Sequence, residues 1–183
     1  MSGHPRSVEE LTHALDQGQR FKYVYFWGHQ PPRGGGVGAG CFSQWWPSAF
    51  EIDGVRFATA EHYMMWRKAK LFGDEEIAER ILTASHPNQA KGFGRQVRGF
   101  DPDAWDSARY EVVVTGNAAK FSQHPDLGAF LAGTGQRVLV EASPVDRIWG
   151  IGLAADDPLA KQPRRWRGLN LLGFALADVR AQA

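Results

Sequence analysis

An acid and an amine lie seven residues apart in the stretch Thr59–Phe72, TAEHYMMWRKAKLF. Thr59 is a good N-cap and no Gly or Pro follows it, so the stretch predicts a helix that starts near Ala60. At about 100° per residue, Glu61 and Lys68 fall roughly 20° apart on one face of that helix. Charge on an apolar face is costly unless the groups pair or react, so a catalytic role is one of two interpretations of this spacing. A helix-dipole role for Glu61 and a snorkelling Lys68 would explain the same residues without a site.

A second carboxylate follows the clearest strand of the sequence, RVLVEA at 137–142. This strand runs into SPVDRIWGIGL at 143–153, which carries Asp146 and Trp149. Side chains at the end of an extended segment often serve function, because loops there tolerate special geometry. The alternative is that Asp146 only accepts hydrogen bonds in a turn.

Composition narrows the class of protein. The chain has 183 residues, 43% hydrophobic and 22% charged, which is typical of one globular domain. Its net charge of +1 indicates no general polyanion-binding surface, so any phosphate site must be local. Aromatic residues make up 12% and include seven Trp, which could line a site for flat rings or fill the core.

Cysteine usage and hydropathy exclude several classes. The single Cys41 excludes an internal disulfide and multi-cysteine metal motifs, and no triad partner is evident for it as a nucleophile. We expect no metal and no cofactor. No apolar run approaches a membrane span and no signal-peptide core is present, so a cytoplasmic location is the default expectation.

The N-terminal half predicts short elements around a loop. Ser7 with Glu10 forms a capping box, so residues 1–20 are expected to hold an accessory helix. FKYVYFW at 21–27 predicts a strand, and the Pro- and Gly-rich residues 28–40 predict a loop. Glycines there formally fit a dinucleotide fingerprint, but no helix-forming run follows, so we reject that fold. Asp53–Gly54 predicts the turn of a small hairpin.

The rest of the chain is mostly helical by pattern. Helices are predicted from Asp74 to about Ala84, from Ser85 through about 100, from Asp101 to about Ser122, over 124–135, and from near Asn170 onward. The second of these would align Lys91, Arg95 and Arg98 on one face, as a solvated stripe or as a phosphate site. We therefore predict a mainly α fold with a minor β element, in which residues 21–183 form one domain.

Six blocks in this order resemble the YbiA/NADAR family over roughly residues 21–181. They are FSQWWPSAF, AEHYMMWRKAKLF, AKGFGRQVRGF, the DAW at 103–105, DRIWGIGL and WRGLNLLGFALADVR. The resemblance implies a mainly α fold with short strands and an N-glycosidase activity. One branch of the family cleaves ribosylamino-pyrimidine 5′-phosphates, which are intermediates of riboflavin biosynthesis, and another removes ADP-ribose from guanine.

The resemblance also assigns residues to a site. The catalytic positions fall on Glu61, Lys68, Trp105 and Asp146. The substrate-binding positions fall on Trp27, Gly28, Ser43, Gln44, Trp45, Arg95, Trp149, Gly150 and Asn170, with Arg95 in the block where a phosphate contact would be sought. Gln44 and Trp45 depart from the usual Asn and Phe of the family, and the Gly-rich stretch is longer. These departures bear on the leaving base and hence on substrate identity.

The bond in both substrate classes joins ribose C1 to an exocyclic amine of a heterocycle. Its hydrolysis builds positive charge on the sugar, which carboxylates stabilise. We expect Glu61 to move a proton and Asp146 to stabilise the cation or direct water, while Trp105 stacks beside the substrate. Lys68 could instead form a Schiff base with C1, and the sequence leaves that route and direct water attack open. His62 points about 100° away from Glu61 and is expected to be a core residue or one that supports the site residues from behind.

Two rival functions remain. ADP-ribosylated guanine could replace the pyrimidine phosphate as substrate, although the net charge argues against tight duplex binding. A non-catalytic ADP-ribose-binding module is the other. The expected partner is a phosphorylated riboside or an ADP-ribosylated guanine, with no membrane partner, and the oligomeric state is left open.

Overall fold

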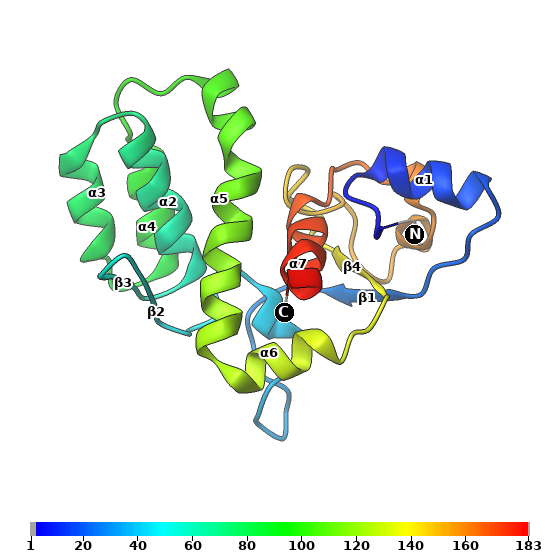
Figure 1. Ribbon diagram of the computed structural model, residues 1–183. Helices are drawn as coiled ribbons and strands as arrows, with labels where there is room; N and C mark the ends of the chain where they lie inside the picture. Colours follow the sequence, from blue (N-terminus) through cyan, green and yellow to red (C-terminus); the bar gives the residue numbers. More distant parts are fainter. Residues whose placement is uncertain (1–2, 183) are drawn as a thin grey trace. The chain divides into compact units, whose positions relative to one another are not determined.

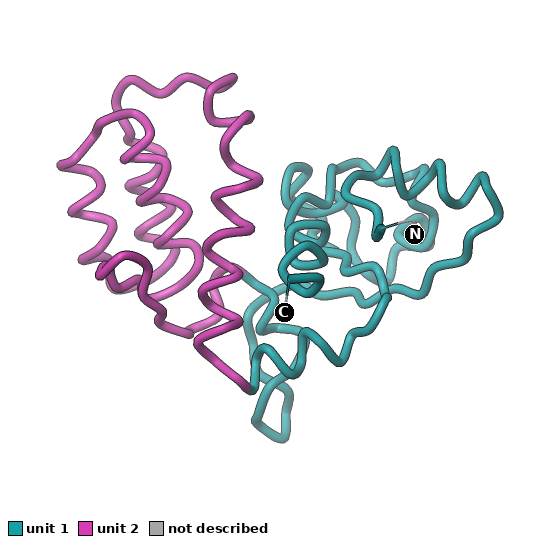
Figure 2. Tube along the Cα trace, in the orientation of Figure 1, with its two compact units in different colours: residues 1–43, 126–183 teal, residues 44–125 magenta. Residues whose placement is uncertain are grey.

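The computed structural model describes residues 3–182 and divides the chain into two compact units. Unit 1 comprises residues 1–43 and 126–183, and unit 2 comprises residues 44–125, which are inserted between the two segments of unit 1 (Figure 2). The described residues form seven α-helices and four short strands (Figure 1). The predicted mainly α fold with a minor β element is therefore confirmed.

Unit 2 holds one hairpin and four helices. They are β2 (Phe50–Ile52), β3 (Val55–Phe57), α2 (Ala60–Leu71), α3 (Glu75–Leu82), α4 (Pro87–Gly94) and α5 (Pro102–Gln123). The hairpin turns at Asp53 and Gly54, which both have a positive φ, as the sequence predicted. Asp74 and Asp101 cap α3 and α5 with their side chains, so the start of each helix is also as predicted.

Helix α2 is the centre of unit 2 and contacts α3, α4 and α5. Two glycines allow these close approaches. A Cβ on Gly116 of α5 would lie 2.5 Å from the Tyr63 ring, and one on Gly94 of α4 would lie 2.1 Å from the Met65 sulfur. The Tyr63 ring is held in turn by Phe57, whose centroid lies 5.0 Å away in an edge-on contact. The aromatic hairpin and two glycine contacts thus fix the position of α2.

Unit 1 is built around a pair of parallel strands. Its elements are α1 (Val8–Asp16), β1 (Tyr23–Phe26), the 3₁₀ helix η1 (Ala39–Phe42), α6 (Pro125–Ala132), β4 (Val138–Glu141), the 3₁₀ helices η2 (Pro158–Lys161) and η3 (Pro163–Arg165), and α7 (Leu171–Gln182). Strand β1 pairs with β4 in register from Tyr23 opposite Val138 to Phe26 opposite Glu141. Helix α7 packs on β4 so closely that a Cβ on Gly173 would lie 2.0 Å from the Leu139 carbonyl oxygen.

The loop between β1 and η1 folds back on itself. A Cβ on Gly40 would lie 2.5 Å from the Gln30 carbonyl oxygen, and one on Gly38 would lie 3.2 Å from the Pro32 ring. Only the short 3₁₀ helix η1 follows this loop. The glycines therefore serve a tight closure, in agreement with the rejection of a dinucleotide fold.

The N-terminal helix departs in detail from the predicted capping box. The Ser7 hydroxyl accepts a hydrogen bond from the Glu10 N–H at 3.0 Å, as expected. The Glu10 carboxylate, however, accepts from the Arg6 N–H at 2.8 Å, one residue earlier than a capping box requires. Helix α1 contacts η3 in unit 1, and none of the helices in residues 3–182 is long and apolar enough to cross a membrane.

Candidate functional site

The site residues predicted from the sequence fall into two sets, one in each unit. Unit 2 holds Gln44, Trp45, Glu61, Lys68, Arg95 and Trp105, and unit 1 holds Trp27, Gly28, Ser43, Asp146, Trp149, Gly150 and Asn170. Each unit therefore positions its own group of candidate side chains.

Glu61 is a buried acid in the first turn of α2. Thr59 caps this helix with its hydroxyl, and the Glu61 N–H donates to the Gln44 carbonyl oxygen at 3.0 Å. Only 4% of the Glu61 side chain is exposed. A residue that served the helix dipole alone would lie in solvent, so this burial favours a chemical role.

His62 has a structural role, as predicted. Its Nε2 donates to the Ala84 carbonyl oxygen at 3.0 Å, and its Nδ1 is 2.8 Å from the Thr59 hydroxyl. A carbonyl oxygen only accepts, so Nε2 carries the proton. Burial lowers the pKa of His62, which keeps the ring neutral between Thr59 and the chain after α3.

Lys68 lies on α2 with its ammonium against aromatic rings. Its Nζ is 4.2 Å from the ring centroid of Phe100 and 6.0 Å from that of Trp105, and the side chain is half-buried. Burial, and secondly the charge of Arg95, lower the pKa of Lys68. The lysine therefore does not simply extend into water, and a larger share of it is in the amine form than for an ordinary lysine.

Phe100 is a neighbour of Lys68 that the sequence reasoning missed. Its ring is 42% exposed and packs edge-on against Phe72 at 5.4 Å. Trp105, by contrast, was predicted and is 8% exposed in the first turn of α5. The RGF ending of the basic block offered one signal, because an aromatic beside a cation can hold an ammonium.

The prediction that Lys91, Arg95 and Arg98 share one face of a helix is wrong. Helix α4 ends at Gly94, so Arg95 is its C-cap and Arg98 lies beyond it. The Arg98 guanidinium binds the Asp74 carboxylate at 2.5 and 3.0 Å, which holds the pKa of that carboxyl well below its usual range. Arg98 therefore has a structural role, because it joins the chain after α4 to the residue that caps α3. Arg95 is exposed and close enough to affect Lys68, so it remains the phosphate candidate of this block.

Gln44 and Trp45 lie beside the start of α2. Gln44 is 7% exposed, and its Oε1 accepts from the Asn117 amide at 2.8 Å. The half-buried Trp45 meets the His86 ring edge-on with centroids 5.7 Å apart. Asn117 of α5 is a second residue that the sequence reasoning missed, since nothing in its local pattern relates it to Gln44.

Asp146 of unit 1 has the turn role that was left open. Its Oδ1 accepts from the N–H groups of Ile148 and Trp149, both at 2.8 Å, and its own N–H donates to the Ser143 hydroxyl at 3.2 Å. The carboxylate thereby shapes the turn that carries Trp149. A catalytic role for Asp146 stays a prediction that the other oxygen would have to fulfil.

Gly150 and Asn170 pack against the backbone of β4 beside that turn. Asn170 is fully buried with a φ of +53°, and its amide accepts from the Glu141 N–H at 3.0 Å and donates to the Leu139 carbonyl oxygen at 2.9 Å. A Cβ on Gly150 would lie 2.8 Å from the Glu141 carbonyl oxygen. These residues therefore position the segment after β4, and the Asn170 side chain is occupied by the strand backbone.

The remaining predicted residues follow β1 or η1. Trp27 is 60% exposed and the φ of Gly28 is +78°, while Ser43 is half-buried directly after η1. The large exposed area of Trp27 is compatible with contact to a ligand.

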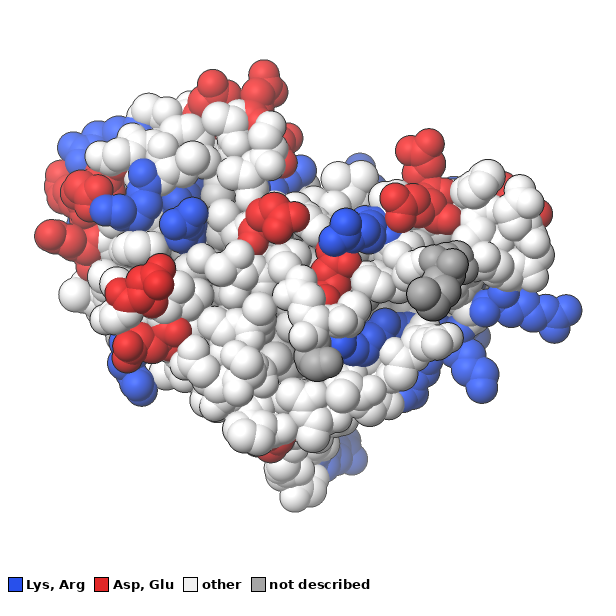
Figure 3. Space-filling model, in the orientation of Figure 1, with Lys and Arg blue, Asp and Glu red and all other residues white. Residues whose placement is uncertain are grey.

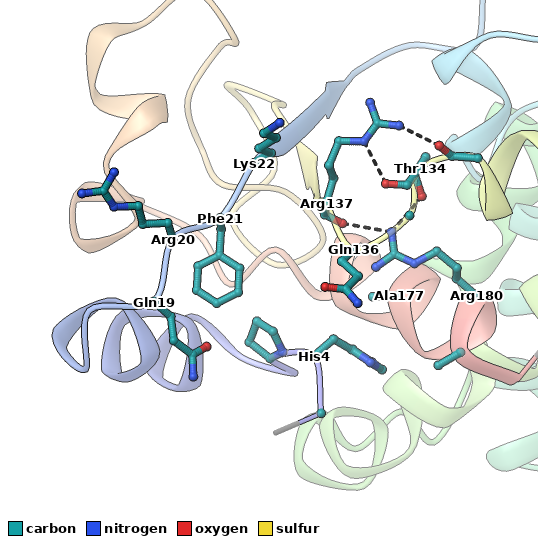
Figure 4. Close-up of a pocket in the computed structure, with 15 residues that line it drawn as sticks. His4, Gln19, Arg20, Phe21, Lys22, Thr134, Gln136, Arg137, Ala177 and Arg180 are labelled. Carbon is teal, nitrogen blue, oxygen red and sulfur yellow. Dashed lines mark hydrogen bonds between the residues drawn. The ribbon is translucent and has the colours of Figure 1, made fainter. Parts of the chain in front are cut away.

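A hollow of about 1010 Å³ in unit 1 contains none of the predicted site residues. Phe21, which precedes β1, points into this hollow (Figure 4). Arg137 donates to the main-chain oxygen of Thr134, and Arg180 donates to the Thr134 hydroxyl and to the main-chain oxygen of Arg137. Over residues 3–182, no three His, Cys, Asp or Glu side chains gather as a metal site would need. We assign this hollow no part in catalysis.

Comparison with known proteins agrees with the resemblance seen in the sequence. The profile of the NADAR domain matches residues 25–183. A relative from Acanthamoeba polyphaga mimivirus, "N-glycosidase R617", is 43% identical over 166 residues, which cover 88% of this chain and 96% of that protein. "N-glycosidase YbiA" of Escherichia coli (strain K12) is 33% identical over 137 residues, covering 75% and 76%. The NMR structure of the E. coli protein YbiA superposes with a TM-score of 0.70 at 28% identity, covering 90% of this chain and 86% of that one.

Proposed function

The chain belongs to the NADAR family, and from that premise we propose that it is an N-glycosidase, a hydrolase of N-glycosyl bonds. The observation that carries this proposal is the pairing on α2 of a buried acid, Glu61, with Lys68 held against aromatic rings. A protein that only bound ADP-ribose would not need to keep an acid away from water at this cost.

The proposed reaction cleaves the bond between ribose C1 and an exocyclic amine of a heterocycle. The nitrogen leaves as an amine, so it must gain a proton as the bond breaks, and the proposed proton donor is Glu61. Positive charge then develops on C1 and the ring oxygen. Asp146 is proposed to stabilise that charge through the oxygen that the turn does not use.

Lys68 offers a covalent route to the same products. When the ribose ring opens, C1 is joined to the leaving nitrogen as an imine. The neutral Lys68 amine adds to C1, the heterocyclic amine departs with a proton from Glu61, and water then hydrolyses the lysine imine to release the ribose with its phosphate still attached. The lowered pKa of Lys68 supports this route, because only the unprotonated amine is a nucleophile.

We propose ribosylamino-pyrimidine 5′-phosphates of riboflavin biosynthesis as the substrates. Arg95 near Lys68 would supply a local cation for the phosphate. An ADP-ribosyl-guanine shares the same bond and is the alternative substrate. On the face drawn in Figure 3, basic and acidic side chains lie interspersed, which disfavours tight binding of a nucleic-acid duplex there.

Incubation with each of the two substrates tests the proposal, with the released base measured by mass spectrometry. We expect release of base from one substrate at least. Glu61→Gln should lower kcat by roughly 10²- to 10⁴-fold with an unchanged melting temperature, because the substitution keeps the shape of the side chain. Near-normal turnover by that variant would remove Glu61 from the mechanism.

Borohydride reduction in the presence of substrate separates the two routes. A ribosyl adduct on Lys68, absent in Lys68→Ala, would support the imine. Direct water attack is indicated if no adduct forms and Lys68→Ala turns over normally.

A further inference from the structure

Two buried amides meet beside the catalytic acid in unit 2. Asn117 is fully buried and Gln44 is 7% exposed. The Asn117 Nδ2 group donates to the Val113 carbonyl oxygen at 2.9 Å and to Gln44 Oε1 at 2.8 Å. Each of its two hydrogens therefore has one acceptor.

This chain of bonds fixes which way the Gln44 amide faces. The Val113 carbonyl can only accept, so the NH₂ group of Asn117 must face it. The second hydrogen of that NH₂ group then needs an oxygen, which Gln44 supplies. Turning the Gln44 amide over would bring two NH₂ groups together, so its own NH₂ group points away from Asn117.

The Gln44 NH₂ group is buried and donates to no group among the described residues. A buried donor without an acceptor is destabilising, and folded proteins hold few of them. The main-chain carbonyl oxygen of Gln44 accepts from the Glu61 N–H, so this unused donor belongs to the residue that abuts the catalytic acid.

We propose that Gln44 recognises a hydrogen-bond acceptor on the leaving heterocycle, and that Asn117 is the positioning residue that turns the Gln44 NH₂ group toward it. This proposal rests on the proposed glycosidase function. Pyrimidinone and guanine rings both carry carbonyl oxygens and ring nitrogens that accept such a bond. A site built around a fixed donor discriminates against a ring that lacks the acceptor, because the donor is then left unpaired.

A double-mutant cycle tests this proposal on whichever substrate the enzyme cleaves. Gln44→Met keeps the length of the side chain and removes the donor, and Asn117→Leu removes the group that orients it. Each should lower kcat/KM roughly 10- to 100-fold. The double variant should lose no more than Gln44→Met alone, because Asn117 acts only through Gln44. Gln17→Met, at the exposed end of α1, is the matched control and should retain wild-type turnover.

Losses that multiply in the double variant would show that Asn117 acts independently, and unchanged turnover in Gln44→Met would show that the donor binds only an ordered water. Either result overturns the proposal. Melting temperatures identify any variant that fails to fold. NMR of the side-chain amides in the free protein tests the orientation without substrate: no strong nuclear Overhauser contact is expected between the Asn117 NH₂ and Gln44 NH₂ hydrogens, because the Gln44 oxygen faces Asn117. A strong contact between the two NH₂ groups would refute the orientation even if turnover is never detected.

Discussion

At the scale of single residues, the Lys68 ammonium is subject to opposing influences. The face of Phe100, 4.2 Å away, favours the charged form, whereas burial and the charge of Arg95 favour the amine. The net effect is a lowered pKa, so the neighbours that oppose charge prevail. A nucleophilic amine needs this balance, because a fully protonated lysine cannot attack C1.

Removing either neighbour should shift the pKa of Lys68 in a predictable direction. Arg95→Gln removes a repelling charge and should raise the pKa, which moves the rise of activity with pH to more alkaline values. Phe100→Leu keeps the site apolar but removes the attractive ring face, so it should lower the pKa and move that rise the opposite way. Reductive ¹³C-methylation of Lys68 followed by an NMR titration measures both shifts. Lys91→Gln, which removes a cation from α4, serves as the control, and shifts of the same sign in both test variants would contradict this account.

Sequence reasoning proposed Glu61, Lys68 and Trp105 as site residues but did not foresee that Phe100 contacts Lys68 or that Asn117 contacts Gln44. Glu61 and Lys68 belong to the same helix, so their spacing alone predicts that they share a face of it. Phe100 reaches Lys68 from the loop before α5, and Asn117 reaches Gln44 from the middle of that helix. Contacts of this kind depend on how helices pack, which a local pattern does not determine.

At the scale of elements, α2 is positioned by α4 and α5, which each pack against it at a glycine. The sequence predicted α2, α3 and α5 with their caps, because those signals are local. It extended α4 too far. The Arg98 N–H donates to the Asp74 carboxylate at 2.9 Å, and this contact with the cap of α3 draws the chain away from a helical path.

Adding one methyl group at Gly116 should destabilise the protein. The new Cβ would lie 2.5 Å from a Tyr63 ring carbon, and the overpacking should cost about 1–3 kcal/mol despite the better helix propensity of alanine. At Gly92 of α4 nothing lies within 4 Å, so Gly92→Ala should instead stabilise by up to about 1 kcal/mol. Urea unfolding of both variants checks the contrast, and equal effects would mean that the glycine contact is unimportant.

His62 should make unit 2 sensitive to acid. The pKa of His62 is lowered on folding, so as pH falls below its ordinary value of 6.5 the unfolded chain takes up the proton first. The free energy of unfolding should therefore fall from pH 7 to pH 5. In His62→Gln, which keeps a donor for Ala84, the decline should be shallower, whereas exposed His13→Gln should behave like the wild type. An identical pH dependence in His62→Gln would exclude His62 as the cause.

At the scale of the whole molecule, the two units differ in how the chain builds them. Unit 2 is continuous, whereas unit 1 joins β1 near the start of the chain to β4 after the insertion. Both strands were predicted from their composition. Their parallel pairing was not, because partners so far apart leave no local signal.

This topology predicts that the two units differ in whether a continuous fragment of each can fold on its own. Residues 44–125 should fold alone, with a helical circular dichroism spectrum and a cooperative thermal transition. Residues 126–183 should not, because β4 would lack its partner β1. Adding a peptide of residues 1–43 should restore the structure. Independent folding of residues 126–183 would show that the strand pair is dispensable.

The contact between Gly40 and the Gln30 carbonyl oxygen has a consequence for how this family can diversify. It holds the beginning of the loop against the first turn of η1, so the residues between Gln30 and Gly40 form a self-contained appendage. Their number can grow or shrink from one homologue to the next without shifting the strand on one side or the buried Phe42 on the other. Evolution thus has a place where it can alter the surface after β1 while the framework stays constant.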